Sequence, residues 1–335
     1  MGAMKVLFVG GTGNISSASA RLAIERGMDL TVLTRGRSAL PPPAGATIVQ
    51  VDVNDRPSIE HALGNALYDV VVDWVAYTPD DVERDLALFR GRTAQYVFIS
   101  SASAYQKPPV HYLITESTPL RNPYWAYSRQ KISCEERLTA AYRDEAFPVT
   151  IVRPSFTYGE TWIPCAIAGL GYTVIDRMRN GRPIIVHGDG QSLWTMTHNS
   201  DFAKGFVGLF GSIQAIGQPF HITSDEVLTW DQIYGAIGAA AGVTPRLVNI
   251  PSDFINACAP EIGAGLLGDK ACSAVFDNSK IKRLVPGFMA TVPFAIGIRQ
   301  SVAWFDADPA RRTVDEARNA TMDRIIDRYE GAWPR

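Results

Sequence analysis

The stretch KVLFVGGTGNIS, residues 5–16, decides the fold. Lys5–Gly10 has the apolar character of a short buried strand, and the glycines after it open a helical segment. Gly10 permits a tight turn, and Gly13 lets the main chain approach a pyrophosphate that the helix N-terminus then holds. The third small position of the pattern is Ser16, where glycine is more usual. A glycine turn between a strand and a helix predicts a dinucleotide-binding site.

Strand and helix patterns alternate from this stretch to about residue 155. Continuous apolar strands that alternate with helices form a parallel sheet covered on both faces. The sequence therefore predicts an α/β, doubly wound (Rossmann) fold, with its ligand at the carboxyl ends of the strands. The expected strands are Asp29–Thr34, Thr47–Val53, Asp69–Tyr77, Tyr96–Ser101 and Val149–Pro154. The expected helices are Ile15–Arg26, Pro57–Leu67, Asp80–Arg90 and Tyr124–Glu145.

Beyond residue 155 glycines and prolines become more frequent and the strands shorter, with helical patterns at Phe202–Leu209 and Trp230–Ala241. We therefore expect residues 1–155 to form the dinucleotide-binding Rossmann domain, with later segments returning to it. Residues 156–335 are expected to form mainly a smaller α+β substrate-binding cap.

Composition excludes several classes of function. The 335 residues are 46% hydrophobic and 20% charged, and the net charge is −2. No basic field favours nucleic acid, and no apolar run approaches the roughly 20 residues that span a bilayer. The start of the chain lacks a secretory pattern, so we expect a cytoplasmic protein. The four cysteines and five histidines have no metal-ligand spacing, so we expect reduced thiols and no metal.

The residues around the glycine turn indicate which dinucleotide is bound. NAD enzymes usually place an acid at the end of the second strand, but here Thr34 is followed by Arg35-Gly36-Arg37. Guanidiniums at Arg35 and Arg37 suit a ribose 2′-phosphate, which favours NADP(H) and leaves NAD(H) possible. The alternative is that both arginines are simply solvated. The loop residues expected to contact the dinucleotide are Gly10, Thr12, Gly13, Asn14 and Ile15.

Two later strand ends are also expected at the cofactor. Asp52 is placed to meet the adenine amino group, with Val53 against the ring. Ala76 is small enough to let the dinucleotide pass.

Tyr127 and Lys131 are four residues apart, so on a helix their side chains share one face. An ammonium one turn from a phenol stabilises the phenolate, which would let the tyrosine exchange a proton near neutral pH. A proton carrier and a hydride carrier together can interconvert a secondary alcohol and a ketone.

Six motifs follow one another along the chain: Gly10-x-x-Gly13, Val51-Asp52-Val53, Phe98–Tyr105, Tyr127-x-x-x-Lys131, Arg153-Pro154-x-x-x-Tyr158-Gly159 and His187–Gly190. In this order they resemble the motifs of the extended short-chain dehydrogenase/reductases, of the NAD-dependent epimerase/dehydratase type. The resemblance implies that Tyr127 is the general acid/base and that Lys131 lowers its pKa and bonds the nicotinamide ribose. It also implies that Ser101 polarises the carbonyl, although a strand-end serine could instead satisfy the main chain.

Departures from the family pattern indicate the substrate. Dehydratases carry an acidic pair after the active-site hydroxyl, where this chain has Ala102 and Ser103, so dehydration is not expected. Nucleotide-sugar members carry an asparagine where this chain has Phe156, and an arginine where it has Trp194. Aromatic replacements suit an uncharged ring better than a diphosphate. The expected substrate-pocket residues are Ser103, Tyr105, Phe156 and Trp194. Alternatively Trp194 belongs to the core, and Arg177, Arg179 or Arg182 serves a phosphate.

These observations favour an NAD(P)-dependent oxidoreductase acting on a secondary alcohol or ketone of a small, non-nucleotide, sugar-like or alicyclic substrate. One alternative is a nucleotide-sugar epimerase with tightly bound cofactor, and another is a non-catalytic nucleotide-sensing or RNA-associated family member. The family resemblance also implies a homodimer, paired through Asp80–Arg90 and Tyr124–Glu145.

Overall fold

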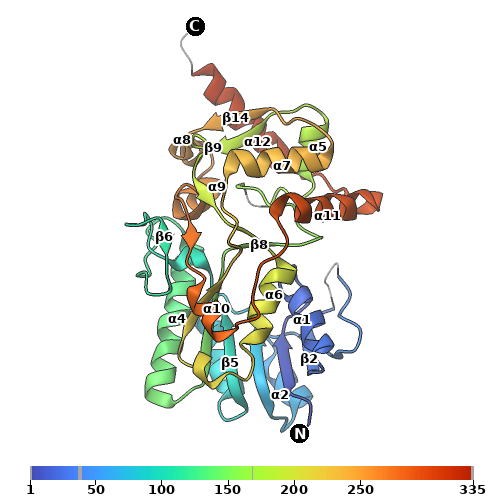
Figure 1. The fold of residues 1–335 in the computed structure, drawn as a ribbon, viewed down its shortest axis with the longest axis vertical. Coiled ribbons are helices and arrows are strands. Elements are labelled where there is room, and N and C mark those ends of the chain that lie inside the picture. Colours follow the sequence, from blue (N-terminus) through green and yellow to red (C-terminus); the bar gives the residue numbers. More distant parts are fainter. Residues whose placement is uncertain (1, 37–39, 168, 333–335) are drawn as a thin grey trace.

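The computed structural model describes residues 2–36, 40–167 and 169–332. Its lower lobe is built on one seven-stranded parallel sheet in the order β12-β7-β5-β4-β1-β2-β3 (Figure 1). The sheet strands are β1 (Lys5–Val9), β2 (Asp29–Thr34), β3 (Thr47–Gln50), β4 (Tyr68–Asp73), β5 (Thr93–Ile99), β7 (Val149–Pro154) and β12 (Pro219–Ile222). The helices packed around it are α1 (Ser16–Glu25), α2 (Arg56–Leu63), α3 (Pro79–Phe89), α4 (Ala126–Glu145), α6 (Asn199–Gly208) and α10 (Ser279–Leu284).

The strand order confirms the predicted doubly wound fold. From β1 the chain builds outward through β2 and β3, then returns to the other side of β1 with β4. A reversal of this kind opens a crevice at the carboxyl ends of the strands. Val70, Val71 and Val72 in β4 are fully buried, as expected for a central strand covered on both faces.

Two of the predicted strands are shorter than expected because side chains end them. β4 stops at Asp73, whose carboxylate accepts the main-chain N–H groups of Val75 and Ala76 and so turns the chain out of the sheet. β3 stops at Gln50, and Asp52 then accepts the N–H of Asn54 in a turn (3.0 Å).

The upper lobe is formed by later segments of the chain (Figure 1). Its helices are α5 (Thr173–Arg179), α7 (Trp230–Ala241), α8 (Ser252–Cys258), α9 (Pro260–Gly265), α11 (Phe294–Asp306) and α12 (Glu316–Gly331), with the π-helical turn η3 (Leu266–Lys270) after α9. Its strands pair in twos: β9 (Ile184–His187) with β14 (Leu247–Ile250), and β10 (Leu193–Trp194) with β13 (Leu228–Thr229). Two further pairs are β8 (Phe156–Tyr158) with β11 (Met196–His198), and β6 (Leu113–Ile114) with β15 (Val275–Phe276). β8 lies between the two lobes (Figure 1).

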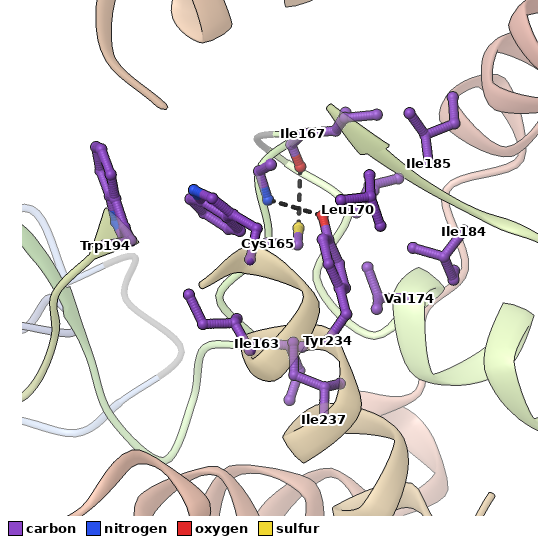
Figure 2. Close-up of a cluster of buried hydrophobic side chains, with 14 of the residues drawn as sticks. Ile163, Cys165, Ile167, Leu170, Val174, Ile184, Ile185, Trp194, Tyr234 and Ile237 are labelled. Atoms are coloured by element: carbon purple, nitrogen blue, oxygen red, sulfur yellow. Dashed lines mark hydrogen bonds between the residues drawn. The ribbon is translucent and has the colours of Figure 1, made fainter. Parts of the chain in front are cut away.

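Three apolar clusters hold the molecule together. Two of them cover the two faces of the large sheet, and β12 and α6 contribute to one of these although they come from the second half of the chain. The third fills the upper lobe, where the Tyr234 hydroxyl accepts the N–H of Ala166 at 3.0 Å (Figure 2). Among the described residues, no helix is both long and apolar enough to pass through a bilayer.

Candidate active site

The glycine turn has the backbone geometry that its sequence predicts. Gly10 (φ 80°) and Gly11 (φ 136°) lie in the left-handed region that favours glycine. A Cβ at Gly10 would stand 3.0 Å from Val75 Cγ1, so the loop also packs against the chain beyond β4. The Gly13 N–H donates to Ser16 Oγ at 2.8 Å where α1 begins. A tight turn before a helix N-terminus fits a dinucleotide pyrophosphate.

Asn14 ties this turn to the second half of the chain. Its side-chain Nδ2 donates to the Thr157 carbonyl at 3.1 Å, and its own carbonyl accepts Asn199 Nδ2 at 2.8 Å. Its Oδ1 is buried without a hydrogen-bond partner among the residues described. Asn14 therefore positions the loop from the side of β8 and α6.

A cavity of about 550 Å³ lies along the loop at the carboxyl ends of the strands. It brings together most of the residues predicted for the cofactor loop and for catalysis. Its lining includes Gly10, Thr12, Gly13, Asn14, Ile15, Ser101, Tyr127, Phe156 and Trp162.

A second cavity of about 230 Å³ shares Gly10, Thr12 and Val75 with the first. Leu33, Thr34, Arg35, Val51 and Val53 complete its lining. Arg35 follows β2 and lines this cavity, whereas Arg37 lies outside the described residues. Asp52 is exposed, and its carboxylate holds the turn after β3. The two cavities form a groove that runs from Arg35 past the glycine turn to Tyr127.

Tyr127 lies in the first turn of α4, with its ring packed against Trp125 at a centroid distance of 4.8 Å. Burial raises the pKa of the phenol to about 12, and a hydrogen bond with the Ser101 side chain opposes that rise. Ser101 Oγ lies 2.9 Å from Ser103 Oγ, which accepts Ser128 Oγ at 2.7 Å. A chain of hydroxyls thus runs from α4 to Ser101, and Ser103, predicted as a pocket residue, is a buried link in it.

Lys131 lies one turn further along α4 and is buried. Its ammonium donates to the carbonyls of Ala76 (2.6 Å) and Ile99 (2.8 Å), and stands 6.0 Å from the Tyr127 ring centroid. Burial lowers the pKa of Lys131 to about 8. The pKa of Tyr127 lies above its usual value, where a lowered one was predicted, because burial of the phenol is the largest influence on it.

Asp73 supports this arrangement and was not predicted from the sequence. It is buried, holds the Val75 and Ala76 peptides through their N–H groups, and accepts Arg84 Nη2 at 3.0 Å. The Ala76 carbonyl on the same peptide segment binds Lys131. The signal was available, since a carboxylate inside the apolar run YDVVVDWVAY needs a buried partner.

Behind Asp73 lies a second buried carboxyl group, Asp85, which also contacts Arg84. Burial, followed by the Asp73 charge, raises the pKa of Asp85 well above its usual range. The Tyr96 hydroxyl donates to it.

Two predicted substrate residues lie in the core instead of the cavity. Trp194 is 2% exposed and packs against Trp230 at a ring-centroid distance of 5.6 Å, because two large apolar rings gain more from each other than from solvent. Tyr105 is fully buried, with its hydroxyl 2.9 Å from His221 Nδ1 and the Arg153 guanidinium over its ring. Of the four predicted pocket residues, Phe156 is the one that lines the cavity.

The three arginines considered as phosphate ligands are held by other partners. Arg177 and Arg182 pair with Asp323, and Arg179 makes a two-point ion pair with Asp306. In residues 2–36, 40–167 and 169–332, no group of three or more His, Cys, Asp or Glu side chains is placed to hold a metal ion.

Comparison with known proteins assigns the family. A model of the NAD dependent epimerase/dehydratase family matches residues 6–222. The chain is 24% identical over 297 residues to 2′-dehydrokanamycin reductase of Streptomyces kanamyceticus, covering 85% of this chain and 80% of that protein. It is 26% identical over 270 residues to the chloroplast stem-loop binding protein of 41 kDa b of Arabidopsis thaliana, covering 75% of this chain and 67% of that protein.

Solved structures agree on the fold. UDP-glucose 4-epimerase of Thermus thermophilus, in complex with NAD, superposes with a TM-score of 0.72 at 21% identity, covering 90% of this chain and 99% of that one. The match of the family model to well over half of the chain, on a parallel sheet with a glycine turn, leads to one assignment. The chain belongs to the NAD dependent epimerase/dehydratase family and is an enzyme of the nicotinamide-dependent dehydrogenase and reductase type.

Proposed function

We propose that the protein is an NADP(H)-dependent oxidoreductase that interconverts a secondary alcohol and a ketone on a small, non-nucleotide, sugar-like or alicyclic substrate. One observation carries the proposal: Ser101 and Tyr127 line the same cavity as the glycine turn. A bound nicotinamide would supply or accept the hydride there, and the chain itself would handle the proton.

Tyr127 suits the role of proton donor to a ketone oxygen. With a pKa of about 12, its phenol keeps its proton at neutral pH and can give it to the oxygen as the hydride arrives. Ser101 would hydrogen-bond the same oxygen. The Ser103 and Ser128 hydroxyls would fix the orientation of the Ser101 hydroxyl. The Lys131 ammonium would stabilise the phenolate left behind, since its pKa of about 8 keeps it mostly charged at neutral pH.

The preference for NADP(H) is supported by the charge of the adenosine end of the groove. Among its described lining residues Arg35 is the charged one, and the end of β2 carries Thr34 where NAD enzymes usually place an acid. The non-nucleotide substrate is supported by Phe156 in the cavity wall and by the partners that already occupy Arg177, Arg179 and Arg182.

We also propose that the upper lobe serves as the substrate-binding cap and that two copies pair through α3 and α4. Arg137 on α4 binds Glu83 on α3, which holds the two helices as one surface. Sedimentation of the purified chain measures this pairing.

Replacing Tyr127 by Phe tests the chemistry. We expect NADPH consumption with a ketone substrate to fall at least about 100-fold, since acid–base catalysis contributes about 10²–10⁴. Tyr124→Phe is the matched control, because Tyr124 is exposed just before the same helix. Full activity in Tyr127→Phe ends this mechanism. Turnover without net NADPH consumption favours a nucleotide-sugar epimerase instead.

A further inference from the structure

Two buried lysines lie beside a single aspartate, Asp269. Lys107 belongs to the chain between β5 and α4, whereas Lys270 and Asp269 belong to η3. The side chains of Lys107 and Lys270 are 1% and 5% exposed. Their ammonium nitrogens lie 3.6 and 3.5 Å from the two oxygens of Asp269. Both distances exceed those of a strong charge-assisted hydrogen bond.

This cluster is rich in donors and poor in acceptors. Each ammonium carries three donors, and among the described residues Asp269 supplies the acceptors within reach. The buried indole N–H of Trp194 also lacks a partner there, and its ring lies 6.0 Å from Lys107 Nζ. One lysine would neutralise Asp269, so the second leaves a buried positive charge uncompensated.

The cluster adjoins the catalytic cavity through two aromatic rings. Lys270 Nζ lies 5.5 Å from the ring centroid of Phe156, which lines the cavity, and 5.4 Å from that of Trp125, which packs on Tyr127. The Asp269 charge also acts on Tyr127, contributing to the rise of its pKa.

η3, which carries Asp269 and Lys270, is fixed to the chain between β5 and α4. Asn122 Nδ2 donates to the carbonyls of Gly268 (2.6 Å) and Ser103 (2.9 Å). A Cβ at Gly268 would lie 2.6 Å from Trp125 Cβ, so η3 packs closely against the start of α4. Single π-helical turns of this kind are frequent at functional sites.

We infer that Lys107 and Lys270 form a subsite for an acid group, a carboxylate or a phosphate, which the substrate carries on the far side of Phe156 from its reacting carbon. The acid oxygens take up the ammonium donors that Asp269 leaves open, and Phe156 separates this subsite from the nicotinamide end of the cavity. As a description of the substrate the inference rests on the proposed function, whereas binding of the anion is measurable without turnover.

Isothermal titration of the NADPH-saturated protein tests anion binding, with glucuronate, glucose 6-phosphate and UDP as probes and glucose as the neutral comparison. We expect a small acid to bind, and Lys270→Met and Lys107→Met each to weaken it about 10- to 100-fold. Lys282→Met is the matched control, because Lys282 is an exposed lysine paired with Asp225. Binding by UDP alone, lost in the lysine variants, supports the anion subsite and removes the non-nucleotide substrate.

Thermal unfolding of the same variants separates a binding role from a structural one. Removing either lysine leaves Asp269 with one partner, so we expect the Tm to stay equal or rise. A lower Tm with unchanged anion affinity means a structural ion cluster and overturns the inference. No binding of any probe at millimolar concentration overturns it too. Full activity in Tyr127→Phe would overturn the proposed reaction and would leave the titration result unaffected.

Discussion

Asp73→Asn is expected to disturb catalysis without touching the cavity. The buried carboxylate holds the Val75 and Ala76 peptides, and the Ala76 carbonyl binds the Lys131 ammonium. Asparagine keeps one oxygen for the two N–H groups but loses the charge that faces Arg84 and Lys131.

The loss of unfolding free energy in Asp73→Asn depends on the contacts that Arg84 keeps. Hydrogen bonds to charged groups contribute about 1.5–3 kcal/mol each. Arg84 keeps contacts with Asp81 and Asp85. The loss should therefore stay near the cost of one such bond, about 1.5–3 kcal/mol in unfolding free energy.

The pH dependence carries the sharper signature. Burial lowers the pKa of Lys131 to about 8, and the Asp73 charge is among the groups that oppose this lowering. Catalysis that needs the charged lysine is lost as pH rises through that value. Without the Asp73 charge the Lys131 pKa falls, so the alkaline limb of the activity profile moves to lower pH.

Urea denaturation and NADPH oxidation from neutral to alkaline pH measure the two effects. Asp69→Asn is the control, because this carboxylate lies at the exposed start of β4 and accepts the Lys5 N–H (2.7 Å). A folded Asp73→Asn protein whose alkaline limb coincides with that of the wild type refutes the link between Asp73 and Lys131.

Two further predictions concern the cofactor and the native pH profile. Arg35→Ala should weaken NADPH binding about tenfold or more while leaving NADH binding unaffected, because a charge-assisted bond to the 2′-phosphate is lost. Fluorescence titration measures this, with Arg26→Ala as the control, because Arg26 is exposed directly after α1. Equal effects on both cofactors would remove the NADP(H) preference. The wild-type reduction rate should fall above about pH 8 with Lys131, while Tyr127, with a pKa of about 12, stays protonated; a rate that stays constant to pH 10 or so contradicts a role for the Lys131 charge.

Local patterns allowed much of the site to be predicted. The glycine turn follows from residues adjacent in the sequence. The residues of that turn line the same cavity as Ser101 and Tyr127. Tyr127 and Lys131 share a helix, so their spacing alone placed them on one face. These features depend on backbone geometry, which short sequence patterns encode well.

Interactions between distant segments could not be predicted in the same way. Trp194 was expected in the pocket, but its surroundings are set by Trp230 on another element. The proximity of Lys107 to Asp269 arises only when segments of the two halves of the chain meet. The pairing of Arg177 on α5 with Asp323 on α12 likewise joins segments that are far apart in the sequence. The pKa of Tyr127 also depends on burial, which the spacing to Lys131 does not reveal.

The place of β12 constrains how this protein can be made. β12 is residues 219–222, yet it pairs with β7, which ends at Pro154. A nascent chain released from the ribosome only as far as residue 155 therefore presents β7 as a bare sheet edge, open to pairing with other chains. The lower lobe cannot close that edge until more than sixty further residues have been synthesised. Truncation between the two strands should consequently yield aggregates in place of an isolated Rossmann unit.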